Sequence, residues 1–419
     1  FSSMVQMDID GIPSSSNNEY VADGLECVSL KFVRDADKID RAEEYAPEYV
    51  YQHFGDSENI VGYKDLSLTI VYSEASMKCY PIIKYNKKMD EAKEGVKADD
   101  IMVKLKNQLP VEQMEMQVES IDEFRAVLAK EDNFKPYGEL IAKFSNGGKD
   151  YEIYKKDDSD PEFDRYLTRA QTLALWYIHA AEYTDNSDDK WMHYFIYESR
   201  RRTDGIDGHT YALAGYCSLY RFYGYPEKIR PRIAQILLLP QYRACGIGAS
   251  FLHRIYQDLA TMKEVKDVTA EDPADGFLYL RDYVEAINLS ALPEFSLEKL
   301  KEGFTEEMYT AANKTFKTNK RQCRRIYEIL RLRSIGKKDE AGLKQYRLDV
   351  KKRLDIPMRR TDKDWKKLNA ALEEEEIQQV AASTPSMEEK QKQLQQMYEA
   401  EVEVYKKTIH RMDKYPKIV

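Results

Sequence analysis

Hydrophobic and polar residues alternate in two short stretches near the start of the chain, VSLKFV from Val28 and LSLTIVY from Leu66. Alternation with a period of two is typical of half-buried strands, so we expect a strand at each place. The spacing changes over residues 163–182, where apolar residues recur every three or four positions. That spacing predicts one amphipathic helix over those residues.

Strand patterns return after this helix as HYFIYES, HTYALAGYCSLY and RIAQILLL. The segment RRRTDGIDG between the first two contains two Asp-Gly pairs, which favour a long β-hairpin. We expect a helix next, with an apolar face over residues 251–262, and then a strand at EVKDVTA. Asp272 is placed to cap a further helix that has Pro273 at its first position.

Strand patterns stop after about Leu292, and the rest of the chain is charged and helical. One predicted helix has an apolar face of Ile326, Ile329, Leu330 and Leu332. Basic residues gather nearby and are expected to form a solvated helix face: Lys314, Lys317, Lys320, Arg321, Arg324 and Arg325. Pro385 is expected to precede a final polar helix.

These patterns predict an α+β protein with several domains, since 419 residues exceed what one core usually holds. Residues 1–20 are polar and are expected to be disordered or a tag remnant. Residues 21–135 should form a small mixed α/β domain, and residues 136–291 a central domain with a mixed β-sheet and flanking helices. Residues 292–419 should form an all-helical C-terminal domain.

The formal net charge of -9 disfavours direct binding to nucleic acid and suits a basic partner better. Five widely spaced cysteines form no CxxC pair, which indicates a reducing compartment and no zinc site. Because no run of about 18 apolar residues occurs, we expect a soluble intracellular protein without a membrane segment.

The stretch QILLLPQYRACGIGASF places two glycines between an apolar strand and a helix. Such a turn can hold an anion on the free N–H groups at the helix start. No GK[ST] follows Gly248, which excludes a P-loop, and the dinucleotide fingerprint fits poorly. The remaining pattern is Arg243-x-x-Gly246-x-Gly248, and a turn with glycines for packing alone is the alternative.

This pattern resembles the coenzyme A pyrophosphate loop of the GNAT acetyltransferase superfamily. Further strings along the chain resemble the catalytic subunit of the type B histone acetyltransferases: TAEDPADGFLYLRD, YPEKIRPRIAQILLLP, FKTNKRQCRRIYEILRL, APEYVYQHFGDSENIVGYKDL and NFKPYGEL. The resemblance runs from about Cys27 to the helical tail. It implies a GNAT core, acetyl-CoA as the acetyl donor without a metal, and lysines of the newly made histone H4 tail as acceptors. A WD-repeat histone chaperone as partner, and residence in nucleus and cytoplasm, are also implied.

The residues expected to bind the cofactor surround the glycine turn: Leu237, Leu238, Leu239, Arg243, Ala244, Cys245, Gly246, Ile247, Gly248 and Ala249. Pro240 cannot donate a hydrogen bond to a β-ladder. We therefore expect the preceding strand to lose its neighbour, which would leave backbone groups of residues 237–239 for an acyl-pantetheine arm. Cys245 as a nucleophile is disfavoured, because no histidine is apparent beside it.

Direct acetyl transfer needs a neutral amine, whereas a free lysine has a pKa of about 10.4, so a general base is expected. By resemblance Glu271 matches the family's catalytic carboxylate and Asp272 its neighbour, although Asp272 also suits a helix cap. A further carboxylate of the family falls at His179 here. This histidine could serve as a base or relay, or be structural.

Trp191 and Tyr220 match aromatic residues that form the family's channel for the target lysine, with core packing as the alternative. Asp56 and Glu58 match positions that meet the basic histone tail, or else are ordinary loop charges. Two other functions stay open. One is a small-molecule amine N-acetyltransferase, and the other is a histone-binding chaperone subunit with weak or vestigial activity.

Overall fold

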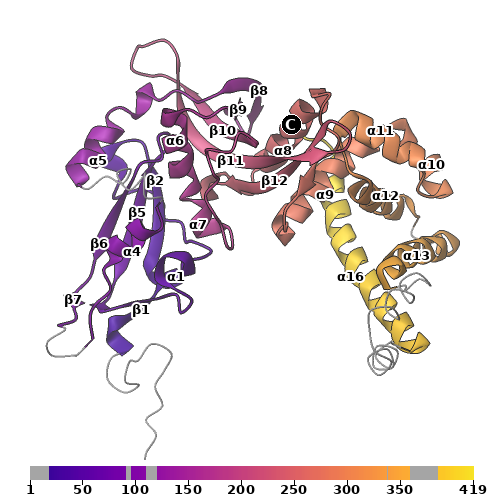
Figure 1. The fold of residues 1–419 in the computed structure, drawn as a ribbon, viewed down its shortest axis with the longest axis horizontal. Coiled ribbons are helices and arrows are strands. Elements are labelled where there is room, and N and C mark those ends of the chain that lie inside the picture. The colour runs from indigo at the N-terminus through magenta and orange to yellow at the C-terminus, as the bar shows by residue number, and fades with distance from the viewer. Residues whose placement is uncertain (1–17, 91–95, 110–119, 337, 359–385) are drawn as a thin grey trace, which may run out of the picture. The chain divides into compact units, whose positions relative to one another are not determined.

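The computed structural model describes residues 18–90, 96–109, 120–336, 338–358 and 386–419 (Figure 1). The chain divides into two compact units. Unit 1 ends at Ile247 and lacks Tyr223–Pro231, which belong to unit 2 together with Gly248–Val419. The domain boundaries at residues 135 and 291 stay predictions. In the ranges described, no helix is long and apolar enough to cross a membrane.

The N-terminal part of unit 1 is built on a three-stranded mixed sheet of order β2-β5-β6, in which β2 and β5 are parallel and β5 and β6 antiparallel. Both predicted strands are confirmed. The elements of this part are β1 (Val21–Asp23), α1 (Gly24–Cys27), β2 (Val28–Val33), α2 (Tyr51–Phe54), β3 (Asn59–Val61), β4 (Tyr63–Lys64), β5 (Ser67–Ser73), β6 (Cys79–Lys84), β7 (Lys87–Lys88), α4 (Ile101–Asn107) and α5 (Ile121–Leu128).

Apolar side chains of β2, β5 and α5, with Ile39 from the loop after β2, form a buried cluster: Val33, Ile39, Val71, Phe124 and Leu128. Burial of each such side chain stabilises the fold by about 1.5–3 kcal/mol, so this cluster holds α5 to the sheet. Residues 1–17 lie outside the described ranges. The expected disorder of residues 1–20 is wrong for Asn18–Tyr20, which form a short 3-10 helix.

A second sheet of unit 1 carries strands in the order β12-β11-β10-β9-β8. The strands are β8 (Glu139–Asn146), β9 (Lys149–Lys156), β10 (Trp191–Arg201), β11 (His209–Gly224) and β12 (Lys228–Leu238). The predicted hairpin is confirmed, because β10 and β11 pair antiparallel from Arg201↔His209 to Trp191↔Tyr220. The register shifts beside Ile196, where Ala214 is the extra residue of a β-bulge.

The single helix predicted over residues 163–182 is wrong. The structure has α6 (Pro161–Gln171) and a short α7 (Ala174–Tyr177), after which the backbone becomes extended. The cause is tertiary, because the carbonyl of Trp176 accepts hydrogen bonds from Glu48 and Tyr49, at 2.8 and 3.0 Å. The N–H of Ala180, which would bond that carbonyl in a helix, donates instead to the Tyr51 hydroxyl.

Unit 2 is helical in its described residues after β13. Its elements are α8 (Ile247–Thr261), which starts at the last residue of unit 1, β13 (Thr269–Ala270), α9 (Asp275–Ser290), α10 (Leu297–Glu302), α11 (Glu306–Phe316), α12 (Lys320–Ser334), α13 (Glu340–Asp355) and α16 (Met387–Lys414). The expected final helix is confirmed in α16, which opens with a capping box between Ser386 and Glu389. Pro385 itself lies outside the described ranges.

The predicted strand EVKDVTA is shorter than expected, since only Thr269–Ala270 forms β13. The predicted helix cap is wrong, because α9 begins at Asp275 and its N-cap is Ala274. Asp272 has a φ of +29°, and Ala274 is extended with a ψ of 155°, so the helix cannot begin at Pro273.

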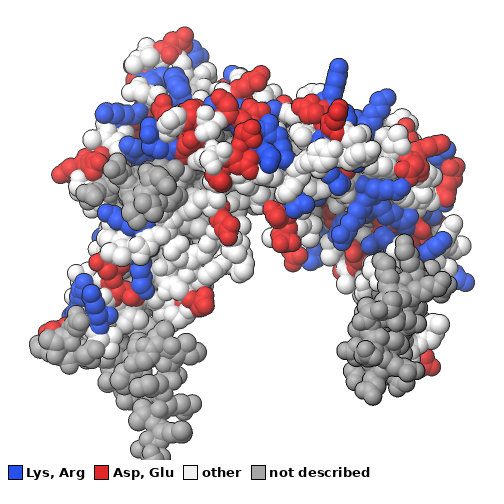
Figure 2. All heavy atoms as spheres, viewed as in Figure 1, with Lys and Arg blue, Asp and Glu red and all other residues white. Residues whose placement is uncertain are grey.

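Figure 2 shows Lys and Arg side chains gathered over α12. The expected solvated face is wrong for two of them, Arg324 and Arg325. Glu328, which is fully buried, accepts hydrogen bonds from Arg324, Arg353 and the Tyr405 hydroxyl at 2.8–3.0 Å. The Arg325 guanidinium likewise bonds the buried Asp282 carboxylate. Periodicity marked α12 but could not show that buried acids lie beside its cations.

Candidate active site

The glycine loop, residues 243–249, joins the end of β12 to α8 through a 3-10 turn at Pro240–Tyr242. Ala244 and Gly246 have positive φ angles of +58° and +92°, which suits glycine and strains alanine. Residues 243–246 are exposed, whereas residues 247–249 are buried as α8 begins. The first N–H groups of a helix lack partners within it, so exposed backbone donors meet a helix start here, as an anion site requires.

Side chains from other strands hold this loop in place. The amide of Asn146, the last residue of β8, donates to the Cys245 carbonyl at 2.8 Å. The Tyr242 hydroxyl donates to Glu198 at 2.8 Å. Burial raises the pKa of Glu198, but hydrogen bonds from Arg200, Tyr242 and Lys149 outweigh it and lower that pKa to about 2. Glu198 is therefore charged, and the turn before the glycines has a fixed anchor.

The end of β12 lies close against β11. A Cβ on Gly215 would lie 2.3 Å from the Leu237 carbonyl oxygen, so only glycine permits this approach. The Leu239 N–H donates to the carbonyl of the bulge residue Ala214 at 2.9 Å. The expectation that residues 237–239 lose their backbone partners is therefore wrong for Leu239, because Pro240 interrupts the ladder only after it.

Arg243 contacts protein groups of unit 1. Its Nε donates to the Leu238 carbonyl at 2.9 Å, and its guanidinium pairs with Glu48 and lies over the Tyr177 ring. Sequence reasoning did not identify Glu48, Tyr177 or Asn146. These contacts join residues up to 195 positions apart, which no local pattern can reveal.

Trp191 and Tyr220 are brought together. They are register partners on β10 and β11, and both are half-buried. The Tyr220 hydroxyl donates to Asp188 at 2.7 Å. Hydrogen bonds from the Lys190 N–H and the Tyr220 hydroxyl lower the pKa of Asp188, and the bond to Asp188 raises that of Tyr220. Asp188 is thus a fixed acceptor that orients the Tyr220 ring.

His179 follows α7 and is exposed. Its ring lies 5.6 Å from that of Tyr49 and 5.5 Å from that of Tyr51, measured between centroids. Tyr51 also accepts the hydrogen bond from Ala180 noted above, at 2.6 Å. The histidine is therefore held by aromatic contacts with the segment that leads into α2.

Asp56 and Glu58 follow α2 in the same unit. Asp56 is exposed, whereas Glu58 is half-buried with a φ of +54°. The Glu58 carboxylate accepts a hydrogen bond from the Val50 N–H at 3.4 Å, and its carbonyl accepts one from Gly24 at 2.8 Å. Glu58 therefore helps to shape the loop, and Asp56 is the acid that a basic ligand can reach.

Glu271 and Asp272 come directly after β13, and both are exposed. They belong to unit 2, as do Gly248 and Ala249, whereas the other predicted site residues belong to unit 1. How Glu271 meets the glycine loop therefore stays a prediction.

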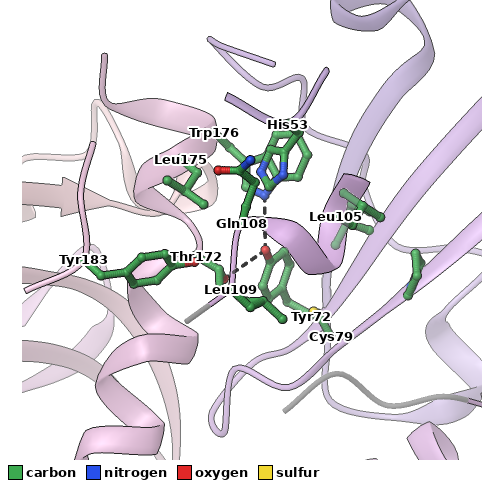
Figure 3. Close-up of a pocket in the computed structure, with 12 residues that line it drawn as sticks. His53, Tyr72, Cys79, Leu105, Gln108, Leu109, Thr172, Leu175, Trp176 and Tyr183 are labelled. Atoms are coloured by element: carbon green, nitrogen blue, oxygen red, sulfur yellow. Dashed lines mark hydrogen bonds between the residues drawn. The ribbon is translucent and has the colours of Figure 1, made fainter. Parts of the chain in front are cut away.

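A small cavity of about 20 Å³ is lined by residues of α2, β5 and α7, and Figure 3 shows the rings of His53 and Trp176 stacked at its wall. The Trp176 Nε1–H donates to the Tyr72 hydroxyl at 3.2 Å, and the Tyr72 and Thr172 hydroxyls share a hydrogen bond at 3.1 Å. Neither ring nitrogen of His53 has a hydrogen-bond partner among the described residues. The cavity has room for about one water molecule, so it is too small for a substrate.

No group of three or more His, Cys, Asp or Glu side chains suited to a metal occurs in the described part of the chain. Cys245 is exposed and its thiol contacts the Tyr242 carbonyl at 3.0 Å. Unit 1 by itself supplies exposed backbone at the glycine loop and the Trp191–Tyr220 ring pair, which suit binding of an anionic cofactor and of an alkyl chain.

Two family models match the chain. Residues 20–179 match the model described as histone acetyl transferase HAT1 N-terminus, and residues 281–332 match histone acetyltransferase type B catalytic subunit, C-terminal. The chain is 34% identical to the mouse protein named histone acetyltransferase type B catalytic subunit, over 405 residues and 94% of each chain. It is 35% identical to the human protein of that name over 402 residues, again with 94% of each chain covered. A solved aminoglycoside acetyltransferase from a soil sample covers 29% of this chain and 78% of that chain, at 15% identity and a TM-score of 0.22.

Proposed function

We propose, because this chain belongs to the family of histone acetyltransferase type B catalytic subunits, that it transfers acetyl from acetyl-CoA to lysine side chains in the N-terminal tail of newly synthesised histone H4. The chain is an acetyltransferase. The observation that carries the proposal is the glycine loop, which presents exposed backbone at Arg243–Gly246 and then begins a helix.

The glycine loop fits the diphosphate of acetyl-CoA. The N–H groups of residues 245–249 would donate to it, and the α8 dipole would add about 0.3–1 kcal/mol of attraction per charge. Backbone groups of Leu237 and Leu238, which precede the Leu239 N–H that bonds Ala214, would pair with the pantetheine arm. The Leu238 N–H would then donate to the thioester carbonyl oxygen, on which negative charge develops during attack.

The acceptor amine must lose its proton before it attacks. Glu271 is the proposed general base, with Asp272 beside it, because both are exposed carboxylates that follow β13. His179 is the second candidate for proton transfer, since its exposed ring replaces a carboxylate expected at that position. Attack is direct, within a complex of enzyme, acetyl-CoA and peptide.

Two features support a histone tail as acceptor. Trp191 and Tyr220 offer ring faces and edges along which the alkyl stem of a lysine can lie. Asp56, with the partly structural Glu58, would attract a basic peptide, and the chain as a whole carries a net charge of -9. A WD-repeat histone chaperone as partner, and residence in nucleus and cytoplasm, belong to the proposal through family membership.

A panel of acceptors tests this function. Transfer of radiolabelled acetyl would be measured on an H4 tail peptide, on the same peptide with each lysine replaced by arginine, and on aminoglycosides and polyamines. The proposal predicts transfer to the H4 peptide, a loss of transfer when a target lysine is replaced by arginine, and no transfer to the aminoglycosides or polyamines. Transfer mainly to the small amines would favour a small-molecule acetyltransferase. Tight peptide binding without any transfer would favour a chaperone subunit.

A further inference from the structure

Arg243 is the first residue of the glycine loop, and its side chain contacts a carbonyl, a carboxylate and an aromatic ring of unit 1. Its Nε donates to the Leu238 carbonyl at 2.9 Å, and its Nη1 donates to the Glu48 carboxylate. The Cζ atom lies 4.6 Å from the centroid of the Tyr177 ring, within the range of a cation–π contact. One guanidinium therefore joins the strand end to an acid and to an aromatic ring.

The direction in which the Leu238 carbonyl points follows from the hydrogen bond of the next residue, Leu239. The Leu239 N–H donates to Ala214 on β11, and in a trans peptide the preceding carbonyl points the opposite way. The Leu238 carbonyl therefore points away from β11. Because the N–H and C=O of one strand residue point to the same side, the Leu238 N–H also points away from β11.

A bare carbonyl on that side would repel a thioester oxygen that approaches the Leu238 N–H. The Arg243 guanidinium caps the carbonyl and places positive charge beside the N–H. The same bond fixes the rotation of the peptide group that follows Leu238, since Ala214 holds the Leu239 N–H of that peptide and Arg243 holds its oxygen. The Leu238 N–H belongs to the preceding peptide group, which is restrained only through the Leu238 backbone. With its carbonyl capped by Arg243, Leu238 presents its N–H as a hydrogen-bond donor on this side of the strand, and no bare carbonyl oxygen stands beside it.

The groups that hold Arg243 are themselves fixed. The N–H groups of Glu48 and Tyr49 donate to the Trp176 carbonyl, which precedes Tyr177 in α7. Tyr177 is only 6% exposed, so its ring is a rigid platform. The Glu48 and Arg243 side chains are 49% and 37% exposed, so solvent weakens their attraction. Glu48 therefore contributes less than the carbonyl bond and the ring.

We infer that Arg243 is a positioning residue, held by Glu48 and Tyr177, that caps the Leu238 carbonyl and so places a positive charge, instead of a bare acceptor, beside the Leu238 N–H where the thioester oxygen approaches. This inference rests on the proposed function, because the thioester is that of acetyl-CoA. It gives residues 48 and 177, which lie outside the glycine loop, a part in acetyl transfer.

Variants of Arg243 and Glu48 test whether the Arg243 side chain positions the Leu238 backbone or attracts the diphosphate of CoA directly. Arg243→Lys keeps the positive charge but loses the planar fork that spans two acceptors and a ring. Positioning predicts that Arg243→Lys lowers kcat by about tenfold with the Kd for CoA within about twofold of wild type. Glu48→Gln should lower kcat by about threefold, and the double variant should match Arg243→Lys alone, because both act through one contact.

The control for Glu48→Gln is Glu43→Gln, which removes one negative charge from the same segment of the chain. Among the described residues, the Glu43 carboxylate accepts a hydrogen bond from the nearby Tyr45 hydroxyl. Glu43→Gln should leave kcat, the Kd for CoA and the Kd for acetyl-CoA unchanged. A kcat of Arg243→Lys equal to wild type, with the Kd for CoA raised about tenfold in Arg243→Ala, would overturn the inference and assign Arg243 to the diphosphate.

A second readout does not depend on the acceptor. The ratio of the Kd for CoA to the Kd for acetyl-CoA should fall in Arg243→Lys, because only acetyl-CoA carries the thioester oxygen. If the wild type transferred no acetyl to the H4 peptide, the proposed function would fail, but this fall in the ratio would still support the positioning role. An unchanged ratio would refute the positioning role whatever the acceptor proves to be.

Discussion

Trp191 and Tyr220 stand directly opposite each other on β10 and β11, and their rings meet edge to face with centroids 5.1 Å apart. Tyr220 is fixed by its hydrogen bond to Asp188, so the pair presents one preformed aromatic surface. Because neither ring is fully buried, part of the ring surface of the pair can be contacted by the side chain of a lysine that accepts the acetyl group.

We predict that Trp191→Ala raises the KM for the H4 peptide by about tenfold, because the lysine stem loses a ring to lie against. Tyr220→Phe keeps the ring and loses only the bond to Asp188, so its KM should stay within about threefold of wild type. Steady-state kinetics on the H4 peptide would measure both. Equal and large effects of the two variants would mean that the hydroxyl, rather than the ring, carries the role.

His179 is predicted to act mainly through its ring contacts with Tyr49 and Tyr51. His179→Phe keeps an aromatic ring for those contacts and removes the ring nitrogens, so turnover should stay within about threefold of wild type, whereas His179→Ala should lower it further. The two turnover numbers would be compared at several pH values. A loss of about 10²-fold in His179→Phe, with a changed pH profile, would instead place a proton-transfer step on His179.

His53 should make the protein sensitive to acid. Burial lowers the pKa of His53 to about 3, below the ordinary value of 6.5, so the folded state binds fewer protons than the unfolded state between those pH values. Stability therefore rises with pH across that window and is lost as pH falls through it, by about 1.4 kcal/mol per pH unit for one such group. His53→Phe should reduce this slope, measured by urea unfolding at pH 5 and pH 7.

Thr172→Val is the control for that experiment, because it lines the same cavity and removes no titrating group. It should change the stability at both pH values by the same amount. An unchanged slope in His53→Phe would contradict the account of His53 as a buried neutral ring.

The Glu328 cluster is predicted to hold unit 2 together. Glu328→Ala leaves the guanidinium groups of Arg324 and Arg353 without their buried acceptor, so the free energy of unfolding should fall by about 3–5 kcal/mol. Glu403→Ala is the control, since that acid is 67% exposed in its pair with Lys406 and should change stability by less than about 0.5 kcal/mol. Similar losses in the free energy of unfolding for the two variants would show that burial of Glu328 does not increase its contribution to stability.

Local patterns predicted much of this fold. The alternation in VSLKFV and the Asp-Gly pairs near residue 205 identified β2 and the β10–β11 hairpin, because strand period and turn chemistry are local properties. The helix over residues 163–182 was wrong for a reason that no window of sequence contains, namely that Glu48 and Tyr49 take the Trp176 carbonyl.

The candidate site shows the same division. The spacing of Gly246 and Gly248 marked the loop, since glycine is needed where φ is positive and where the backbone approaches a ligand. The cap of Leu238 by Arg243, and the acid that holds Arg243, depend on side chains brought together by the tertiary fold. Glu48 could not have been distinguished in the sequence from the other glutamates around it.

The central claim is that Glu271 is the general base for acetyl transfer, and Glu271→Gln tests it most directly. Turnover on the H4 peptide should fall by about 10²-fold or more, with the Kd for peptide and for acetyl-CoA unchanged. Asp272→Asn is the matched control, since it makes the same change at the next residue and should lose less. Turnover of Glu271→Gln equal to that of wild type would contradict the account.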